Sequence, residues 1–277
     1  MSQLEDLLQQ CTVKLILSGR HGTGFFVTPK YILTCAHVVK GFEGQLIQVQ
    51  QNQKNWAQAV VERSLPEPYD LALLRIQFPL NSIPPCVYLG TDIQSRDPLY
   101  TFGYPDEDFP NGCPVTFSNE GLTGDEPALI KFALGQVRPG MSGSPLLNQR
   151  TGKVCGIIKF TRDRSTDLGG GAITTEAILA QFAKLTEEQQ LFHQSDQRWW
   201  RQMQVSSDEM LQQEEQAGNL AQYRTHVIKL IRPCWKSNSH TDREIYRDIL
   251  HQHRLNYRIS EEEAFEKSTT PPQADGV

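Results

Sequence analysis

Short apolar runs separated by turn residues dominate the first two thirds of the 277-residue chain. Residues 11–19 are predicted to form a strand that ends in a turn, and residues 31–34 form another short run of strand-forming residues. From about 83 to 160 such runs alternate with turn signals, among them Asn111-Gly112. Strands this short, at this spacing, are typical of a barrel or a sandwich, so the pattern predicts a mainly β fold.

The apolar period changes near Thr174, where Ile178, Leu179, Phe182 and Leu185 recur at helical spacing. Two more helical stretches are predicted at about 208–231 and 241–253, before an acidic and then proline-containing tail. We therefore expect three parts: a mainly β domain at 1–190, a small helical region at 191–258 and a disordered tail at 259–277.

The charge and the cysteine spacing of the chain bear on which partners and cofactors can be expected. The formal net charge of −5 carries no strongly basic balance, so nucleic acid is not expected as a partner. The six cysteines form no C-x-x-C pair and no paired Cys/His spacing, so we expect no metal and no cofactor. The N-terminus lacks the pattern of a signal peptide, and no apolar run approaches membrane-spanning length. We expect a cytoplasmic protein with free thiols and no membrane partner.

Candidate chemistry centres on Gly140-Met141-Ser142-Gly143-Ser144-Pro145. A serine nucleophile in acyl transfer needs an exposed hydroxyl and backbone N–H groups aimed at the developing oxyanion. The flanking glycines allow the backbone dihedrals of such a turn. Because Gly, Ser and Pro also favour ordinary turns, a surface turn between two strands is the alternative.

Two further residues supply the remaining groups. His37 follows the apolar run at 31–34, and Asp70 precedes the apolar run at 71–76. Taken singly, they could be a satisfied core histidine and a turn aspartate. Together with Ser142 they make a catalytic triad: histidine takes the serine proton, and aspartate fixes the imidazole tautomer and stabilises the imidazolium.

Four ordered motifs resemble the trypsin-like serine peptidases, over about residues 11–182. They are Gly24-Phe25-Phe26-Val27, Ile32-Leu33-Thr34-Cys35-Ala36-His37-Val38-Val39, Asp70-Leu71-Ala72-Leu73-Leu74 and Gly140-Met141-Ser142-Gly143-Ser144-Pro145. They are most similar to the bacterial, disulfide-free branch that includes the Deg-type proteases. The resemblance implies two six-stranded antiparallel β-barrels and a serine endopeptidase, with His37 and Asp70 on the first barrel and Ser142 on the second.

The same resemblance assigns further roles. The backbone N–H groups of Gly140 and Ser142 would form the oxyanion hole. The residues implied to bind substrate are Gln136, Lys159, Phe160, Thr161 and Gly171. Gln136 falls at the floor of the pocket for the residue before the scissile bond (P1), and a neutral floor favours an uncharged P1 residue. For the substrate-binding set, an ordinary barrel strand and loop is the alternative.

Three residues depart from the family pattern. Met141 stands where activated digestive proteases have an aspartate that pairs with a freed N-terminal amine, so activation of that kind is not expected. Val38 replaces a disulfide cysteine. Lys159 is unusual in the strand that pairs with substrate, and the sequence offers no explanation for it.

The C-terminal region matches no enzyme motif. Residues 193–258 carry a modest basic excess, together with Trp199-Trp200, Trp235 and Tyr257. These residues predict a regulatory protein partner or self-association, with solvated helix faces as the alternative. Two other functions stay open: a catalytically silent protease fold that binds peptides, and the protease component of a bacterial defence or programmed-death assembly, by analogy alone.

Overall fold

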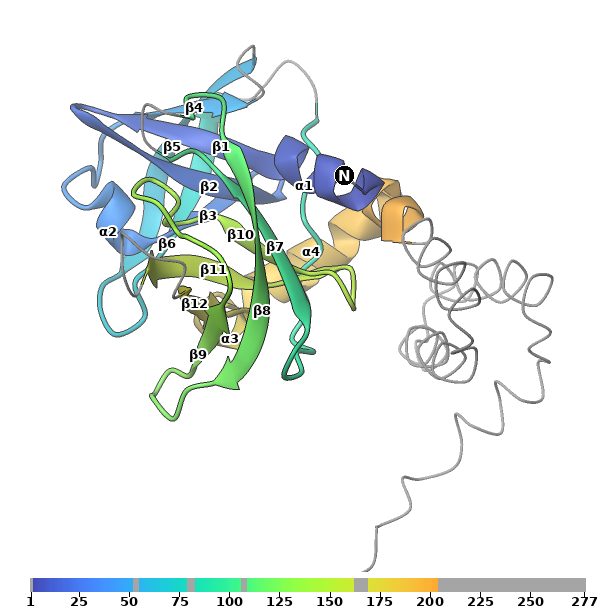
Figure 1. The fold of residues 1–277 in the computed structure, drawn as a ribbon. Helices are drawn as coiled ribbons and strands as arrows, with labels where there is room; N and C mark the ends of the chain where they lie inside the picture. Colours follow the sequence, from blue (N-terminus) through green and yellow to red (C-terminus); the bar gives the residue numbers. More distant parts are fainter. Residues whose placement is uncertain (1, 52–54, 79–82, 106–108, 162–168, 204–277) are drawn as a thin grey trace, which may run out of the picture. The chain divides into compact units, whose positions relative to one another are not determined.

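The computed structural model describes residues 2–51, 55–78, 83–105, 109–161 and 169–203 (Figure 1). The side chains of Phe160 and Thr161 lie outside this description, although their backbone belongs to a strand. The helices predicted at 208–231 and 241–253 and the tail at 259–277 also lie outside the described residues.

Residues 198–203 are helical, and twelve strands and four helices precede them in the described part. They are α1 (Gln3–Cys11), β1 (Thr12–Leu17), β2 (Arg20–Thr28), β3 (Tyr31–Thr34), α2 (Ala36–Val39), β4 (Ile47–Gln51), β5 (Asn55–Leu65), β6 (Leu71–Phe78), β7 (Pro98–Gly103), β8 (Cys113–Leu122), β9 (Leu129–Ala133), β10 (Pro145–Asn148), β11 (Lys153–Thr161), β12 (Gly170–Thr174), α3 (Thr175–Gln181) and α4 (Lys184–Ser195).

The strands form two closed antiparallel barrels of six strands each, which confirms the predicted fold. The first barrel has the order β1-β2-β3-β6-β5-β4, and the second has the order β10-β11-β12-β9-β8-β7 (Figure 1). Buried and less buried residues alternate along some of these short strands, so that one face of each points into a barrel. In β9, Ile130 and Phe132 are buried while Leu129, Lys131 and Ala133 are half-buried.

Strand β11 has a core contact on each side. Ile158 packs in the second barrel with Phe117 and Phe132. Its neighbour Ile157 belongs to the apolar cluster that holds first-barrel residues such as Phe25. Because successive strand residues point to opposite faces, β11 carries part of the boundary between the barrels.

Helix α1 is an element that the apolar pattern did not predict. Its start is a capping box: the Glu5 N–H donates to Ser2 Oγ at 3.3 Å, and the Ser2 N–H donates to Glu5 Oε2 at 3.0 Å. Leu4, Leu7 and Leu8 are buried on one face. The sequence signal was the three-residue spacing of Ser2 and Glu5, a capping-box pattern, just before Leu7 and Leu8.

The helical period near Thr174 marks α3 and α4, and the Thr174 side chain caps α3. Gln189 of α4 donates to the carbonyls of Val27 and Val87, at 2.6 and 2.8 Å. Trp199 is 1% exposed and donates to the Gly152 carbonyl at 2.9 Å. The compact unit therefore extends to Met203, and the boundary expected at 190 falls inside α4. Among the described helices, none has the length and apolar character needed to cross a membrane.

Candidate active site

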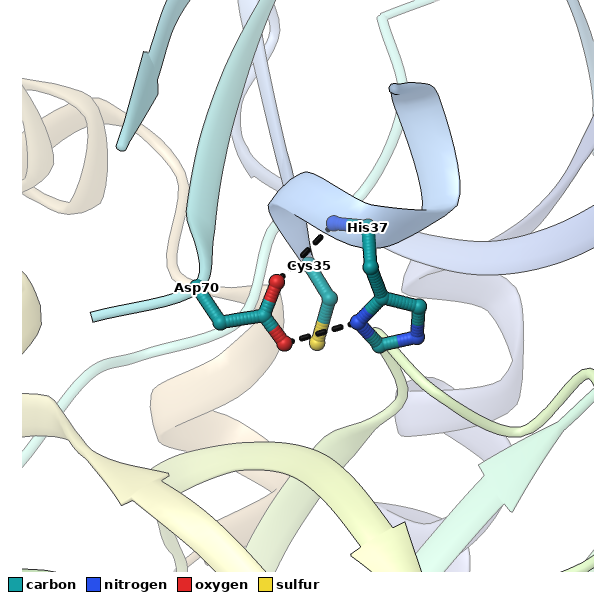
Figure 2. Close-up of side chains that lie close together, drawn as sticks. All are labelled: Cys35, His37 and Asp70. Atoms are coloured by element: carbon teal, nitrogen blue, oxygen red, sulfur yellow. Dashed lines mark hydrogen bonds and ion pairs between the residues drawn. The ribbon is translucent and has the colours of Figure 1, made fainter. Parts of the chain in front are cut away.

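His37 and Asp70 meet because β3 pairs with β6. Thr34 lies opposite Ala72, so the residues just beyond these paired ends come together. The Ala36 N–H donates to the Asp70 carbonyl at 3.1 Å. His37, in the short helix α2, places its Nδ1 2.7 Å from Asp70 Oδ2, and its backbone N–H donates to Asp70 Oδ1 at 2.9 Å (Figure 2).

The environment of this pair is asymmetric. The Asp70 side chain is 4% exposed, whereas the His37 side chain is 50% exposed. A buried carboxylate is costly without hydrogen-bond donors, and here both oxygens accept from His37. The contact engages Nδ1 and leaves Nε2 for proton transfer. Asp70 also adopts a φ of 51°, in the left-handed region that aspartate tolerates and that recurs at functional sites.

Cys35 lies next to the pair (Figure 2). Its sulfur and one ligand atom each from His37 and Asp70 lie within 4.8 Å of one another. A metal would require a thiolate, but burial raises the pKa of the Cys35 thiol well above its usual value. The thiol instead donates to the Ile158 carbonyl at 3.3 Å, and His37 Nδ1 is engaged by Asp70. The donor set therefore fits a hydrogen-bonded pair better than a metal centre.

Ser142 lies in the loop before β10, and two glycines shape that loop. Gly140 and Gly143 both have a φ of 91°, which disfavours other residues. A Cβ on Gly140 would also lie 2.6 Å from the Tyr104 carbonyl oxygen. Within the described residues, the N–H groups of Gly140 and Ser142 donate to no protein acceptor. Both N–H groups are therefore available to a ligand.

Contacts with both barrels hold this loop. Thr23 of β2 donates from Oγ1 to the Gly140 carbonyl at 2.8 Å, and its N–H approaches the Ser142 carbonyl at 3.4 Å. The Gly143 N–H donates to the Ile158 carbonyl at 2.9 Å. Sequence reasoning did not single out Thr23. Its only signal was a threonine between two glycines, Gly22 and Gly24.

The Ser142 hydroxyl donates to the Lys159 carbonyl at 3.1 Å. In the described part of the chain, no hydrogen bond joins it to His37. The structure thus brings His37 and Asp70 into contact and sets the Ser142 hydroxyl against β11. Catalytic hydrogen bonds are often long or unformed without substrate and tighten when it binds.

The substrate-binding residues implied by the resemblance occupy β11, β12 and the loop after β9. Gly171 of β12 pairs with Phe160 of β11. Gln136 is half-buried in the loop that follows β9. The Lys159 side chain is 11% exposed and contacts Glu67, a residue that sequence reasoning did not single out.

Two closed β-barrels, a His–Asp pair on the first and a glycine-flanked serine on the second define the class of two-barrel serine peptidases. The family described as "Trypsin-like peptidase domain" matches residues 22–157 of this chain. The resemblance drawn from the four motifs is thereby confirmed.

A curated relative is the mouse (Mus musculus) "Peroxisomal leader peptide-processing protease", 27% identical over 154 residues. The match covers 52% of this chain, and the chain spans 26% of the mouse protein.

Solved structures share the fold. An inactive form of the Rv3671c protease of M. tuberculosis, a serine-to-alanine mutant, superposes with a TM-score of 0.56 at 22% identity, covering 67% of this chain and 91% of that one. A serine endoprotease from Yersinia pestis gives a TM-score of 0.55 at 20% identity, covering 68% of each chain.

Proposed function

We propose that this chain is a serine endopeptidase that hydrolyses peptide bonds of protein substrates, with Ser142 as nucleophile, His37 as general base and Asp70 as its orienting carboxylate. The observation that carries the proposal is that both carboxylate oxygens of the buried Asp70 are hydrogen-bonded to His37. The alternative, a histidine buried in the core with its hydrogen bonds satisfied, does not fit, because the His37 side chain is 50% exposed. The match of residues 22–157 to the trypsin-like peptidase domain supports the same reaction.

The reaction proceeds in two halves. His37 Nε2 takes the Ser142 proton as Oγ attacks the substrate carbonyl, and the Gly140 and Ser142 N–H groups receive the oxyanion. The imidazolium then returns the proton to the leaving amine, which leaves an acyl-enzyme. Water, activated by the same histidine, hydrolyses that ester. Before these steps can occur, the Ser142 hydroxyl must break its hydrogen bond to the Lys159 carbonyl and rotate toward His37.

Turnover of a peptide or protein substrate by purified protein tests this function. The rival proposal is a catalytically silent module that binds peptides. One observation favours it: the Ser142 hydroxyl donates to the Lys159 carbonyl rather than to His37. The two separate cleanly, because a silent module would bind peptides and release them uncut. Cleavage fragments identified by mass spectrometry, absent with Ser142→Ala protein, decide for the enzyme.

We expect uncharged P1 residues of small to medium size. Gln136, which the resemblance places at the pocket floor, offers hydrogen bonds but no counter-ion for a cation. Profiling with a peptide library measures this preference. A profile dominated by Arg or Lys at P1 would refute it, and Gln136→Asp supplies the matched comparison, since a carboxylate there should shift the preference toward basic residues.

We also propose a cytoplasmic location and a regulatory role for the C-terminal region. The described cysteines Cys11, Cys35, Cys86, Cys113 and Cys155 are free thiols, as a reducing compartment favours. Residues 204–258 carry Trp235, Tyr257 and most of the basic residues of the 193–258 stretch. Aromatic and arginine side chains are enriched at protein interfaces, which supports a protein partner or self-association there.

Truncation after Met203 tests the regulatory role. The compact unit ends at that residue, so the shortened protein should fold and keep its reaction with small substrates. It should lose the partner or the self-association and change its rate on protein substrates. A truncation after Leu191 is the informative contrast: losing the buried Trp199 should cost about 3–5 kcal/mol of stability, or more. Identical sizing, pull-down and cleavage results for full-length and 1–203 protein would refute the role.

A further inference from the structure

Lys159 is the residue of β11 at which the strand pairing shifts. Ile158 pairs with Ala172 and Phe160 pairs with Gly171, so Lys159 is the extra residue of a bulge. Bulges re-aim side chains and recur next to active sites. Here the Lys159 side chain reaches the first barrel, while its carbonyl accepts the Ser142 hydroxyl at 3.1 Å.

The ammonium group of Lys159 has two acceptors on the first barrel. Its Nζ lies 2.7 Å from Glu67 Oε2 and 3.1 Å from the Pro68 carbonyl. The lysine side chain is only 11% exposed, so a cation there requires partners of this kind. Both acceptors lie in the turn that ends at Asp70, whose N–H donates to the Pro66 carbonyl at 3.2 Å.

One residue therefore contacts both halves of the site. Its carbonyl contacts the nucleophile on the second barrel, and its ammonium holds the turn that delivers Asp70 on the first. We propose that Lys159 is a positioning residue, which sets the Glu67–Asp70 turn, and through it His37, in register with Ser142. This inference rests on the proposed function, because it assigns the alignment of the same three groups.

The positioning role proposed for Lys159 would affect the reaction rate rather than the stability of the fold. Glu67 is 72% exposed, and ion pairs so open to water contribute little to folding. Alignment is more sensitive, since a displacement of about 1 Å in reacting groups can cost roughly a hundredfold in rate. Removing the ammonium should therefore reduce the rate while leaving the thermal midpoint nearly unchanged.

The experiment compares Lys159→Met, which keeps chain length and removes the charge, with Lys159→Arg, which keeps the charge. Lys153→Met, on the same strand but beside Tyr88, is the matched control. For each variant we would measure kcat and KM for a peptide, the rate at which a fluorophosphonate probe labels Ser142, and the Tm. The probe does not need to pair with β11, so it reports on the alignment of the nucleophile rather than on substrate binding.

We expect Lys159→Met to lose about tenfold to a hundredfold in kcat and in labelling rate, with KM and Tm little changed. Lys159→Arg should recover most of the loss, and Lys153→Met should match wild type. Combining Lys159→Met with Glu67→Gln should add little, because both changes disrupt the same contact. Wild-type labelling by Lys159→Met protein, or a loss that only tracks a lower Tm, would overturn the inference. Wild-type protein that fails to label would instead refute the proposed function.

Discussion

Replacing Ser142 with alanine should reduce peptide hydrolysis by a factor on the order of 10⁴–10⁶, with the fold intact. The reason is that no other described hydroxyl combines two flanking glycines at positive φ with free N–H groups at its own position and at Gly140. The measurement is kcat/KM on a peptide that the wild type cleaves. Because the groups act as a unit, His37→Ala should cost a similar factor, and the double variant should be little worse than either.

Ser144→Ala is the matched control for this loop. Ser144 is buried, and its hydroxyl has no hydrogen-bond partner among the described residues. Removing it should leave the rate within a few-fold of wild type. Substantial hydrolysis by Ser142→Ala protein, or additive losses in the double variant, would contradict the assignment of the three residues to one catalytic unit.

Asp70→Asn should cost roughly 10⁴ in turnover, the second largest effect. The change keeps size and shape, but an amide presents one acceptor oxygen and one NH2 donor group where the carboxylate offers two acceptor oxygens. With both Asp70 oxygens accepting from His37, one contact must be lost or the imidazole must take the wrong tautomer. Steady-state kinetics with circular dichroism as a check on folding measure the effect.

Asp125→Asn is the comparison for this change, since Asp125 is exposed in the turn between β8 and β9. It should retain the wild-type rate. A loss of less than about tenfold in Asp70→Asn protein would mean that the carboxylate does not orient the base.

The mainly β fold and the His–Asp contact were predictable from sequence because their signals are local, whereas the two barrels were expected only from the resemblance of the four motifs. Alternating apolar runs define the strands. His37 lies three residues after the end of β3, and Asp70 directly precedes the start of β6. Once β3 and β6 pair, the contact follows from geometry. The glycines beside Ser142 marked its loop in the same way, since they occupy positions where only glycine is unstrained.

The parts that sequence reasoning missed depend on contacts between distant positions. Lys159 and Glu67 are 92 residues apart, and Trp199 and Gly152 are 47 apart. No periodicity or spacing connects such pairs, which is why the sequence alone offered no explanation for Lys159 and no sign that Trp199 packs on the barrels. Thr23 was missed for the same reason, because its acceptor at Gly140 lies 117 residues away.

Labelling with a fluorophosphonate probe tests the central claim most directly, since only an activated serine reacts at a useful rate. The measurement is the site and rate of modification of the full chain, mapped by mass spectrometry. We predict one adduct on Ser142, lost in Ser142→Ala protein, formed much more slowly in His37→Ala protein and unchanged in Ser144→Ala protein. Folded wild-type protein that takes up no probe, or that carries the adduct on another residue, would contradict it.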